Sequence, residues 1–133
     1  MKRGITFGVF DVFHIGHLNM LKKAKEYCDY LIVAVHDDRL NIKSVEFLYS
    51  LEDRIKMVSA IRFVDEVIRY ERVDLSLPTV DFDVLLCGPD QNHQYFQNAF
   101  RYCKKNEKDI QLLARTEGIS STKIREIVNS KNV

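Results

Sequence analysis

The sequence has no tryptophan, two prolines and three cysteines in 133 residues. Cys28, Cys87 and Cys103 are odd in number, far apart and never spaced as C-x-x-C, which argues against a disulfide framework or a zinc site and fits a reducing compartment. No apolar run approaches the roughly 20 residues that cross a bilayer, and no signal-peptide pattern precedes the first strand-like segment. We therefore expect a cytoplasmic protein without a membrane partner.

Neither sign of charge is in excess, because twenty basic and nineteen acidic residues leave a formal net charge of +1. The chain therefore lacks the basic field on which nucleic-acid binding relies, and we expect no nucleic-acid partner. Its length is typical of a single domain, which can form a hydrophobic core without disulfide bonds or a structural metal. We expect one domain over residues 1–133.

Strand-like and helix-like segments alternate along the chain. Residues 5–10 and 30–35 are apolar runs typical of buried strands, and helical spacing begins near Leu18 between them. The segments 39–50 and 73–81 fit neither pattern, and the first is polar enough to be a mobile lid. Further strands are predicted at 66–68, 83–87 and 110–113, and helices at 51–61, 95–104 and from Ser120 or Ser121 to about 128. The alternation predicts an α/β, Rossmann-like, doubly wound parallel sheet, with its site where the strand order reverses.

The segment G-V-F-D-V-F-H-I-G-H, residues 8–17, joins the first predicted strand to the first predicted helix. A helix N-terminus favours anions, and His14 and His17 would extend such a site along a polyphosphate. Gly8 and Gly16 would let the backbone approach phosphate closely.

Two alternatives remain open for this histidine pair. His14 and His17 could be helix-start residues satisfied by local hydrogen bonds, or they could bind a metal with the nearby Asp11. The sequence has no H-E-x-x-H spacing, so we predict no protein-held metal site.

A second candidate anion site reads R-T-E-G-I-S-S-T-K-I-R over residues 115–125. The hydroxyl groups of residues 120–122 and the amides of the following helix could hold phosphate oxygens. The planar guanidinium of Arg115 could donate two hydrogen bonds to the same phosphate. The alternative is a plain capping motif, which accounts for the serines but not for Arg115 and Gly118 beside them.

Together, G-x-F-D-x-x-H-x-G-H and R-T-E-G-I-S-S-T-K-I-R resemble the cytidylyltransferase family, within the H-x-G-H nucleotidyltransferase superfamily. The glycerol-3-phosphate enzymes are closest in pattern, and the resemblance covers nearly the whole chain. It implies transfer of CMP from CTP to a phosphorylated small molecule, with Mg²⁺ bound mainly through the triphosphate and pyrophosphate as the second product. It also implies a homodimer, with Arg62 and Asp65 in a dimer-contact stretch, and products that commonly enter capsule, cell-wall or lipid synthesis.

The resemblance also implies roles for individual residues. Its catalytic residues would be His14, His17, Lys43 and Arg115. Its nucleotide-binding residues would be Gly8, Val9, Phe10, Asp11, Gly16, Asp90, Arg115, Glu117, Gly118, Ile119, Ser120, Ser121 and Thr122. Its acceptor-binding residues would be Asp38, Lys43, Glu46 and Arg54.

The chain departs from the glycerol-3-phosphate pattern near the acceptor. Residues 41–50 keep Lys43 but place Val45, Glu46 and Phe47 where those enzymes are rich in lysine, and the tryptophan that follows their G-D-D is absent. A glutamate and aromatic residues would suit an acceptor with an amino or amide group better than a polyol phosphate. The alternatives are an adenylyltransferase that uses ATP and a non-catalytic nucleotide-binding sensor.

Overall fold

The structure, a computed structural model, describes residues 1–37, 47–114 and 126–128. Its elements are β1 (Arg3–Gly8), α1 (Ile15–Lys25), β2 (Tyr30–His36), α2 (Leu51–Ser59), β3 (Glu66–Tyr70), α3 (Val73–Ser76), the 3₁₀ turn η2 (Leu77–Thr79), β4 (Val84–Cys87), α4 (Gln94–Lys105) and β5 (Asp109–Leu112). The alternation of strands and helices agrees with the sequence pattern. The described part of the predicted last helix is a helical turn at residues 126–128.

Several predicted boundaries shift by one or two residues, and two differences bear on the site. The first strand begins and ends two residues earlier than expected, so that Val9 and Phe10 lie in the loop before α1. The stretch 73–81, which has no periodic pattern, contains α3 and η2. These are four and three residues long, too short for a helical period to show in the sequence.

The five strands form one parallel sheet in the order β3-β2-β1-β4-β5. The chain builds outward from β1 to β3 and then returns to place β4 on the other side of β1. The strand order therefore reverses between β1 and β4, as expected for a doubly wound sheet, and a ligand crevice is expected at their carboxyl ends.

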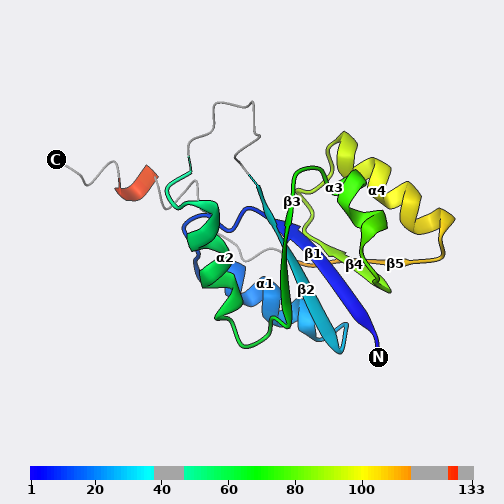
Figure 1. Ribbon diagram of the computed structural model, residues 1–133, viewed down its shortest axis with the longest axis horizontal. Coiled ribbons are helices and arrows are strands. Elements are labelled where there is room, and N and C mark those ends of the chain that lie inside the picture. The colour runs from blue at the N-terminus through cyan, green and yellow to red at the C-terminus, as the bar shows by residue number, and fades with distance from the viewer. Residues whose placement is uncertain (38–46, 115–125, 129–133) are drawn as a thin grey trace.

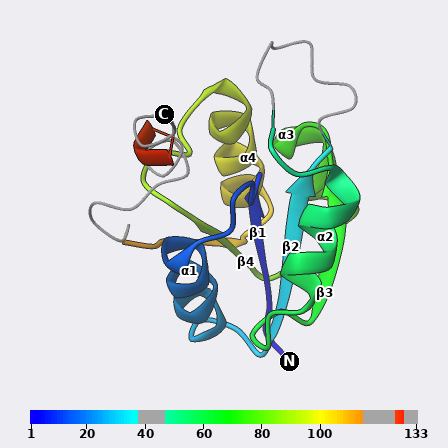
Figure 2. The same ribbon diagram turned by 90° about the vertical axis from the view of Figure 1, so that its left-hand side faces the viewer.

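Helices cover both faces of the sheet (Figure 1). In Figures 1 and 2, α1 and α2 lie on one side and α3 and α4 on the other. Successive side chains of β2 pack into the hydrophobic cores on opposite faces of the sheet. Leu31, Val33 and Val35 pack toward α1 and α2, and Ile32 and Ala34 pack toward α3 and α4. Burial on both faces explains why this strand reads as an unbroken apolar run.

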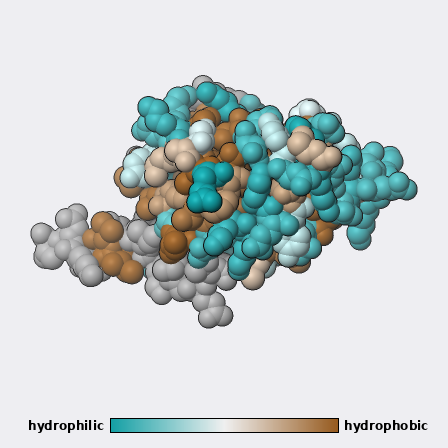
Figure 3. Space-filling view, turned by 90° about the horizontal axis from the view of Figure 1, so that it is seen from below, coloured by the Kyte–Doolittle hydropathy of each residue, from teal (hydrophilic) through white to brown (hydrophobic). Residues whose placement is uncertain are grey.

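The face of the molecule in Figure 3 is mostly hydrophilic, with apolar residues in several places between the polar ones. Within the described residues, every helix is too short or too polar to cross a membrane.

Candidate active site

The two histidines of the H-x-G-H segment form the N-terminal cap of α1. His14 is the N-cap residue, and its Nδ1 accepts a hydrogen bond from the Gly16 N–H at 3.0 Å. His17 reaches back so that its Nδ1 accepts from the His14 N–H at 3.2 Å. The rings stack with their centroids 3.9 Å apart. The local hydrogen bonds considered above are therefore present, and they fix both rings.

These bonds also decide which nitrogen of each ring can donate. Because Nδ1 is an acceptor in both rings, the proton of each neutral imidazole is assigned to Nε2. Burial lowers the pKa of His17 to about 4, neighbouring His14 lowers it as well, and Asp11 partly opposes both. Near neutral pH, His17 is thus an uncharged ring with an N–H at Nε2. Such a group can bind a phosphate oxygen without first losing the hydration of a cation.

The lowered pKa of His17 makes both stability and ligand binding depend on pH. The unfolded chain protonates this ring near pH 6.5 and the native protein only near pH 4, so native stability should fall as the pH drops from 6.5 toward 4. A polyphosphate beside the ring would raise its pKa, so nucleotide binding should take up a proton in that range. An NMR titration of the His17 ring with and without CTP measures both values. A ligand-free pKa of 6.5 or above would contradict this assignment.

The loop between β1 and α1, residues 9–14, is called the histidine loop below and has an unusual backbone. Phe10 and Val12 have positive φ angles of 57° and 50°, which are costly for residues other than glycine and especially for a β-branched one. A Cβ on Gly8 would lie 2.7 Å from the ring of Phe10, which is 2% exposed. Gly8 was predicted to admit a phosphate, and in the structure its missing side chain leaves room for this ring. The tight packing holds the strained loop in place.

Asp11 anchors the segment that precedes α2. Its carboxylate is 2% exposed and accepts from the Leu48 N–H at 2.8 Å and the Tyr49 N–H at 2.9 Å. Ser50 follows as the N-cap of α2, and its hydroxyl oxygen accepts from the Asp53 N–H. Asp11 was predicted to bind nucleotide. The described contacts give it a positioning role between the histidine loop and α2, and its contact with nucleotide stays a prediction.

Arg54 also connects the histidine loop to the segment that precedes α2. The residue is fully buried, and its Nη1 donates to the carbonyl oxygens of Val9 at 3.0 Å and His36 at 2.9 Å. Its Nε donates to the Tyr49 carbonyl at 3.2 Å. The guanidinium thus joins the ends of β1 and β2 to the residues before α2. These bonds give Arg54 a positioning role, and its predicted contact with the acceptor stays a prediction.

Gln91 bridges the point where the strand order reverses. Its Oε1 accepts from the Gly88 N–H at 3.1 Å, just after β4, and its Nε2 donates to the carbonyl of Phe7 in β1 at 2.6 Å. Sequence reasoning missed Gln91, since a glutamine in a polar turn carries no distinctive signal. Asp90, which was predicted to bind nucleotide, lies in the same turn, where its carbonyl accepts from the Asn92 N–H.

The structure describes two further residues singled out in the sequence, and the remaining predictions lie outside its described residues. Asp65 accepts from Lys25 and from the Leu31 N–H of its own chain, so its carboxylate is already engaged without a second protomer. His93 is the N-cap of α4, and its Nδ1 accepts from the Tyr95 N–H at 3.2 Å. The predictions that lie outside the described residues are Asp38, Lys43, Glu46, Arg115, Glu117, Gly118, Ile119, Ser120, Ser121 and Thr122.

Among the residues that the structure describes, no three His, Cys, Asp or Glu side chains are grouped so that they could hold a metal ion. Cys87 ends β4, close to the crevice, and burial raises the pKa of its thiol to about 11. Such a thiol is protonated at neutral pH and is a poor nucleophile.

Comparisons with known proteins cover nearly the whole chain. The profile of the cytidylyltransferase-like family matches residues 5–127. The glycerol-3-phosphate cytidylyltransferase of Bacillus subtilis is 38% identical over 130 residues, which cover 95% of this chain and 96% of that protein. The FAD synthase of Thermococcus kodakarensis is 38% identical over 128 residues, which cover 92% of this chain and 78% of that one.

Among solved structures, the lipopolysaccharide core biosynthesis protein of Thermoplasma volcanium superposes with a TM-score of 0.71 at 24% identity. The match covers 87% of this chain and 97% of that chain. At this level of identity the similarity supports the fold alone.

Proposed function

Because the chain belongs to the cytidylyltransferase-like family, we propose that it transfers CMP from CTP to a phosphorylated small molecule and releases pyrophosphate. The observation that carries this proposal is the histidine cap of α1 beside the reversal point of the sheet. There, the two stacked imidazole rings and the positive end of a helix dipole lie together at the place where a polyphosphate would bind.

The reaction needs no general base, because an acceptor phosphate is ionised at neutral pH. One of its oxygens forms a bond to the α-phosphorus of CTP while the bond from that phosphorus to the bridging oxygen breaks and pyrophosphate leaves. Two anions must therefore meet in line, and catalysis consists of positioning and charge stabilisation. His14 and His17 would donate to oxygens of the triphosphate, and His17 would do so as a neutral ring.

The remaining charge would be managed by residues assigned through the sequence resemblance. We propose that Lys43 bridges the reacting phosphates and that Arg115 and residues 120–122 surround the triphosphate. Mg²⁺ that accompanies CTP would neutralise further phosphate charge through the phosphate oxygens. The homodimer implied by the resemblance belongs to the same proposal and can be measured by sedimentation.

A second candidate is adenylyl transfer from ATP, which the similarity to an archaeal FAD synthase favours. The H-x-G-H segment would contact the phosphates and not the base, so it suits both reactions.

Pyrophosphate release with Mg²⁺ and either CTP or ATP separates these candidates. The panel of acceptors should include glycerol 3-phosphate, ethanolamine phosphate, choline phosphate, sugar phosphates and phosphorylated amino acids. We expect turnover with CTP. Turnover with ATP alone would favour adenylyl transfer, and no turnover with either nucleotide would leave a binding protein.

A further inference from the structure

The pairing between β1 and β4 stops before either strand ends. β1 is paired with β2 along its whole length. Within the described residues, its pairing with β4 ends at Ile5 and Leu85, although β1 continues to Gly8 and β4 to Cys87. The two strands therefore separate toward their carboxyl ends, at the point where the strand order reverses.

The backbone groups that would form the next bond of this ladder can be identified. The Arg3 carbonyl accepts from the Asp83 N–H at 2.8 Å, so the odd-numbered residues of β1 direct their backbone groups toward β4. Phe7 is one of these, and the same register would place it opposite Cys87. In a parallel ladder a carbonyl accepts from the N–H one residue beyond its paired residue. The next bond would therefore run from the Gly88 N–H to the Phe7 carbonyl.

The side-chain amide of Gln91 lies between these two groups. Its Oε1 accepts from the Gly88 N–H at 3.1 Å, and its Nε2 donates to the Phe7 carbonyl at 2.6 Å. A direct ladder bond would hold the two backbone atoms about 2.9 Å apart. The inserted amide keeps them further apart and still gives each of them a partner, which an opened sheet would otherwise lack at a cost in stability. Gln91 thus holds β1 and β4 apart by the width of one amide.

The space beside this bridge is open. A Cβ added to Gly88 would meet no atom within 4 Å in the part of the chain that the structure describes, whereas a Cβ on Gly4 or Gly8 would lie 2.8 Å or 2.7 Å from a side chain. Gly88 directly follows β4, and Asp90, which was predicted to bind nucleotide, lies in the same turn. Doubly wound sheets bind their ligands at this point of the fold.

We propose that Gln91 is a positioning residue for the nucleotide, which sets the width of the opening between β1 and β4 and so determines how tightly the nucleoside part of CTP is held. The inference rests on the proposed cytidylyl transfer. The histidine cap of α1 would bind the triphosphate, so the nucleoside is the part of CTP left for the opening. The residues predicted to bind the acceptor follow β2, which lies on the other side of β1. Gln91 should therefore affect CTP and not the acceptor.

Gln91→Met tests this role, because methionine is similar in length and volume but replaces neither hydrogen bond. With Mg²⁺ and the best acceptor of the panel, we expect the KM for CTP to rise about 10-fold while kcat and the KM for the acceptor change less than about twofold. A general loss of folded protein would instead lower kcat at an unchanged KM. Inhibition by inorganic triphosphate should stay the same, because the histidine cap is intact.

Gln91→Asn is a smaller change at the same position. It keeps the amide but shortens its reach by one methylene, so that it cannot bond both Gly88 and Phe7 at their present separation. The KM for CTP should rise here too, which secures the test if the methionine variant does not fold.

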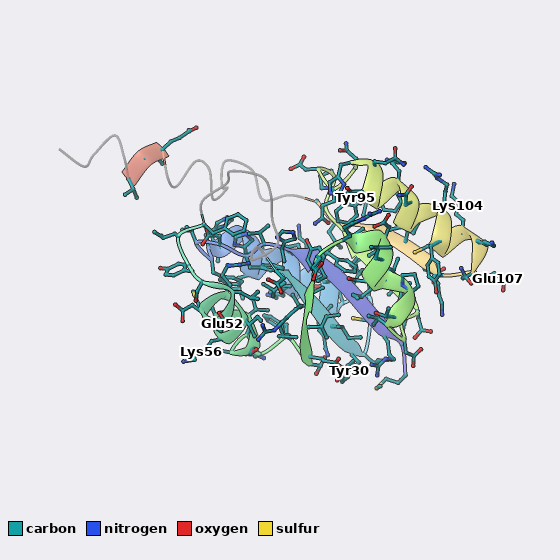
Figure 4. The ribbon with its side chains drawn as sticks, turned by 45° about the horizontal axis from the view of Figure 1, so that its top comes forward. Tyr30, Glu52, Lys56, Tyr95, Lys104 and Glu107 are labelled. Carbon is teal, nitrogen blue, oxygen red and sulfur yellow. The ribbon has the colours of Figure 1, made fainter. Side chains whose placement is uncertain are left out.

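Gln97→Met is the matched control. The exposed Gln97 side chain also donates to a backbone carbonyl, that of Asn92 at 3.1 Å, but this bond joins the turn to α4 and not one strand to another. Figure 4 shows this helix running from Tyr95 at its start to Lys104 near its far end. The control should leave the KM for CTP within about twofold of the wild-type value.

The other outcomes contradict the proposal at different levels. An unchanged KM for CTP in the Gln91 variants, or an equal rise in Gln97→Met, overturns the positioning role of Gln91 and leaves cytidylyl transfer standing. Weaker inhibition by triphosphate in Gln91→Met would place the effect at the histidine cap and overturns the role as well. No pyrophosphate from CTP with the wild-type protein and any acceptor overturns the proposed function, and this inference with it.

Discussion

His17→Ala is expected to lower kcat by about 100-fold or more while the protein remains folded. The substitution removes an Nε2–H donor that we place on the triphosphate, and the loss of one preorganised donor at a developing charge has an effect of that order. It also removes the acceptor for the His14 N–H, which is a smaller, structural loss. Pyrophosphate release measures kcat, and circular dichroism checks the fold.

His17→Asn separates the two roles of this side chain. The asparagine oxygen can accept from the His14 N–H in place of Nδ1, but it offers no donor where Nε2 lies. We expect the cap and the stability to be largely restored and the activity to stay low. Recovery of activity in His17→Asn would show that the ring acts only through the cap, against the mechanism proposed here.

Arg54→Leu is expected to lower the free energy of unfolding by about 3–5 kcal/mol. Leucine fills part of the volume but leaves the carbonyls of Val9, His36 and Tyr49 without their charged donor in a fully buried place. Urea denaturation measures the loss. Because those carbonyls set the position of the histidine loop, turnover should fall even where the variant is folded.

Arg101→Leu serves as the control for Arg54→Leu. Arg101 is exposed on α4, so the same change of side chain there should alter the unfolding free energy by no more than about 0.5 kcal/mol. If the two variants were equally stable, the three carbonyl contacts of Arg54 would not be the reason for its burial.

The sequence predicted the features that leave a local pattern. Burial on both faces makes β2 an unbroken apolar run, and the alternation of elements indicated the parallel sheet and its reversal point. The histidine loop could be found because its residues are close together in the chain and begin a helix. The short helix α3 lies below the length at which periodicity is visible.

The contacts that position the site could not be found in this way. Asp11 reaches residues 48 and 49, Arg54 reaches Val9, and Gln91 reaches Phe7, each by a bond from a side chain to a distant backbone group. Such bonds require only a donor or an acceptor on the backbone, which every residue except proline supplies in both kinds. No pattern in the sequence identifies the partner, so these roles emerge only when the strands are assembled.

We propose that this protein transfers the α-phosphorus of CTP, as part of CMP, to an acceptor phosphate. The most direct measurement uses CTP labelled with radioactive phosphorus at either the α or the γ position, together with the acceptor panel and Mg²⁺. We expect the α label to appear in a CDP-linked product and the γ label in pyrophosphate. Transfer of the γ label to the acceptor, or retention of both labels in CTP with every acceptor, would contradict it.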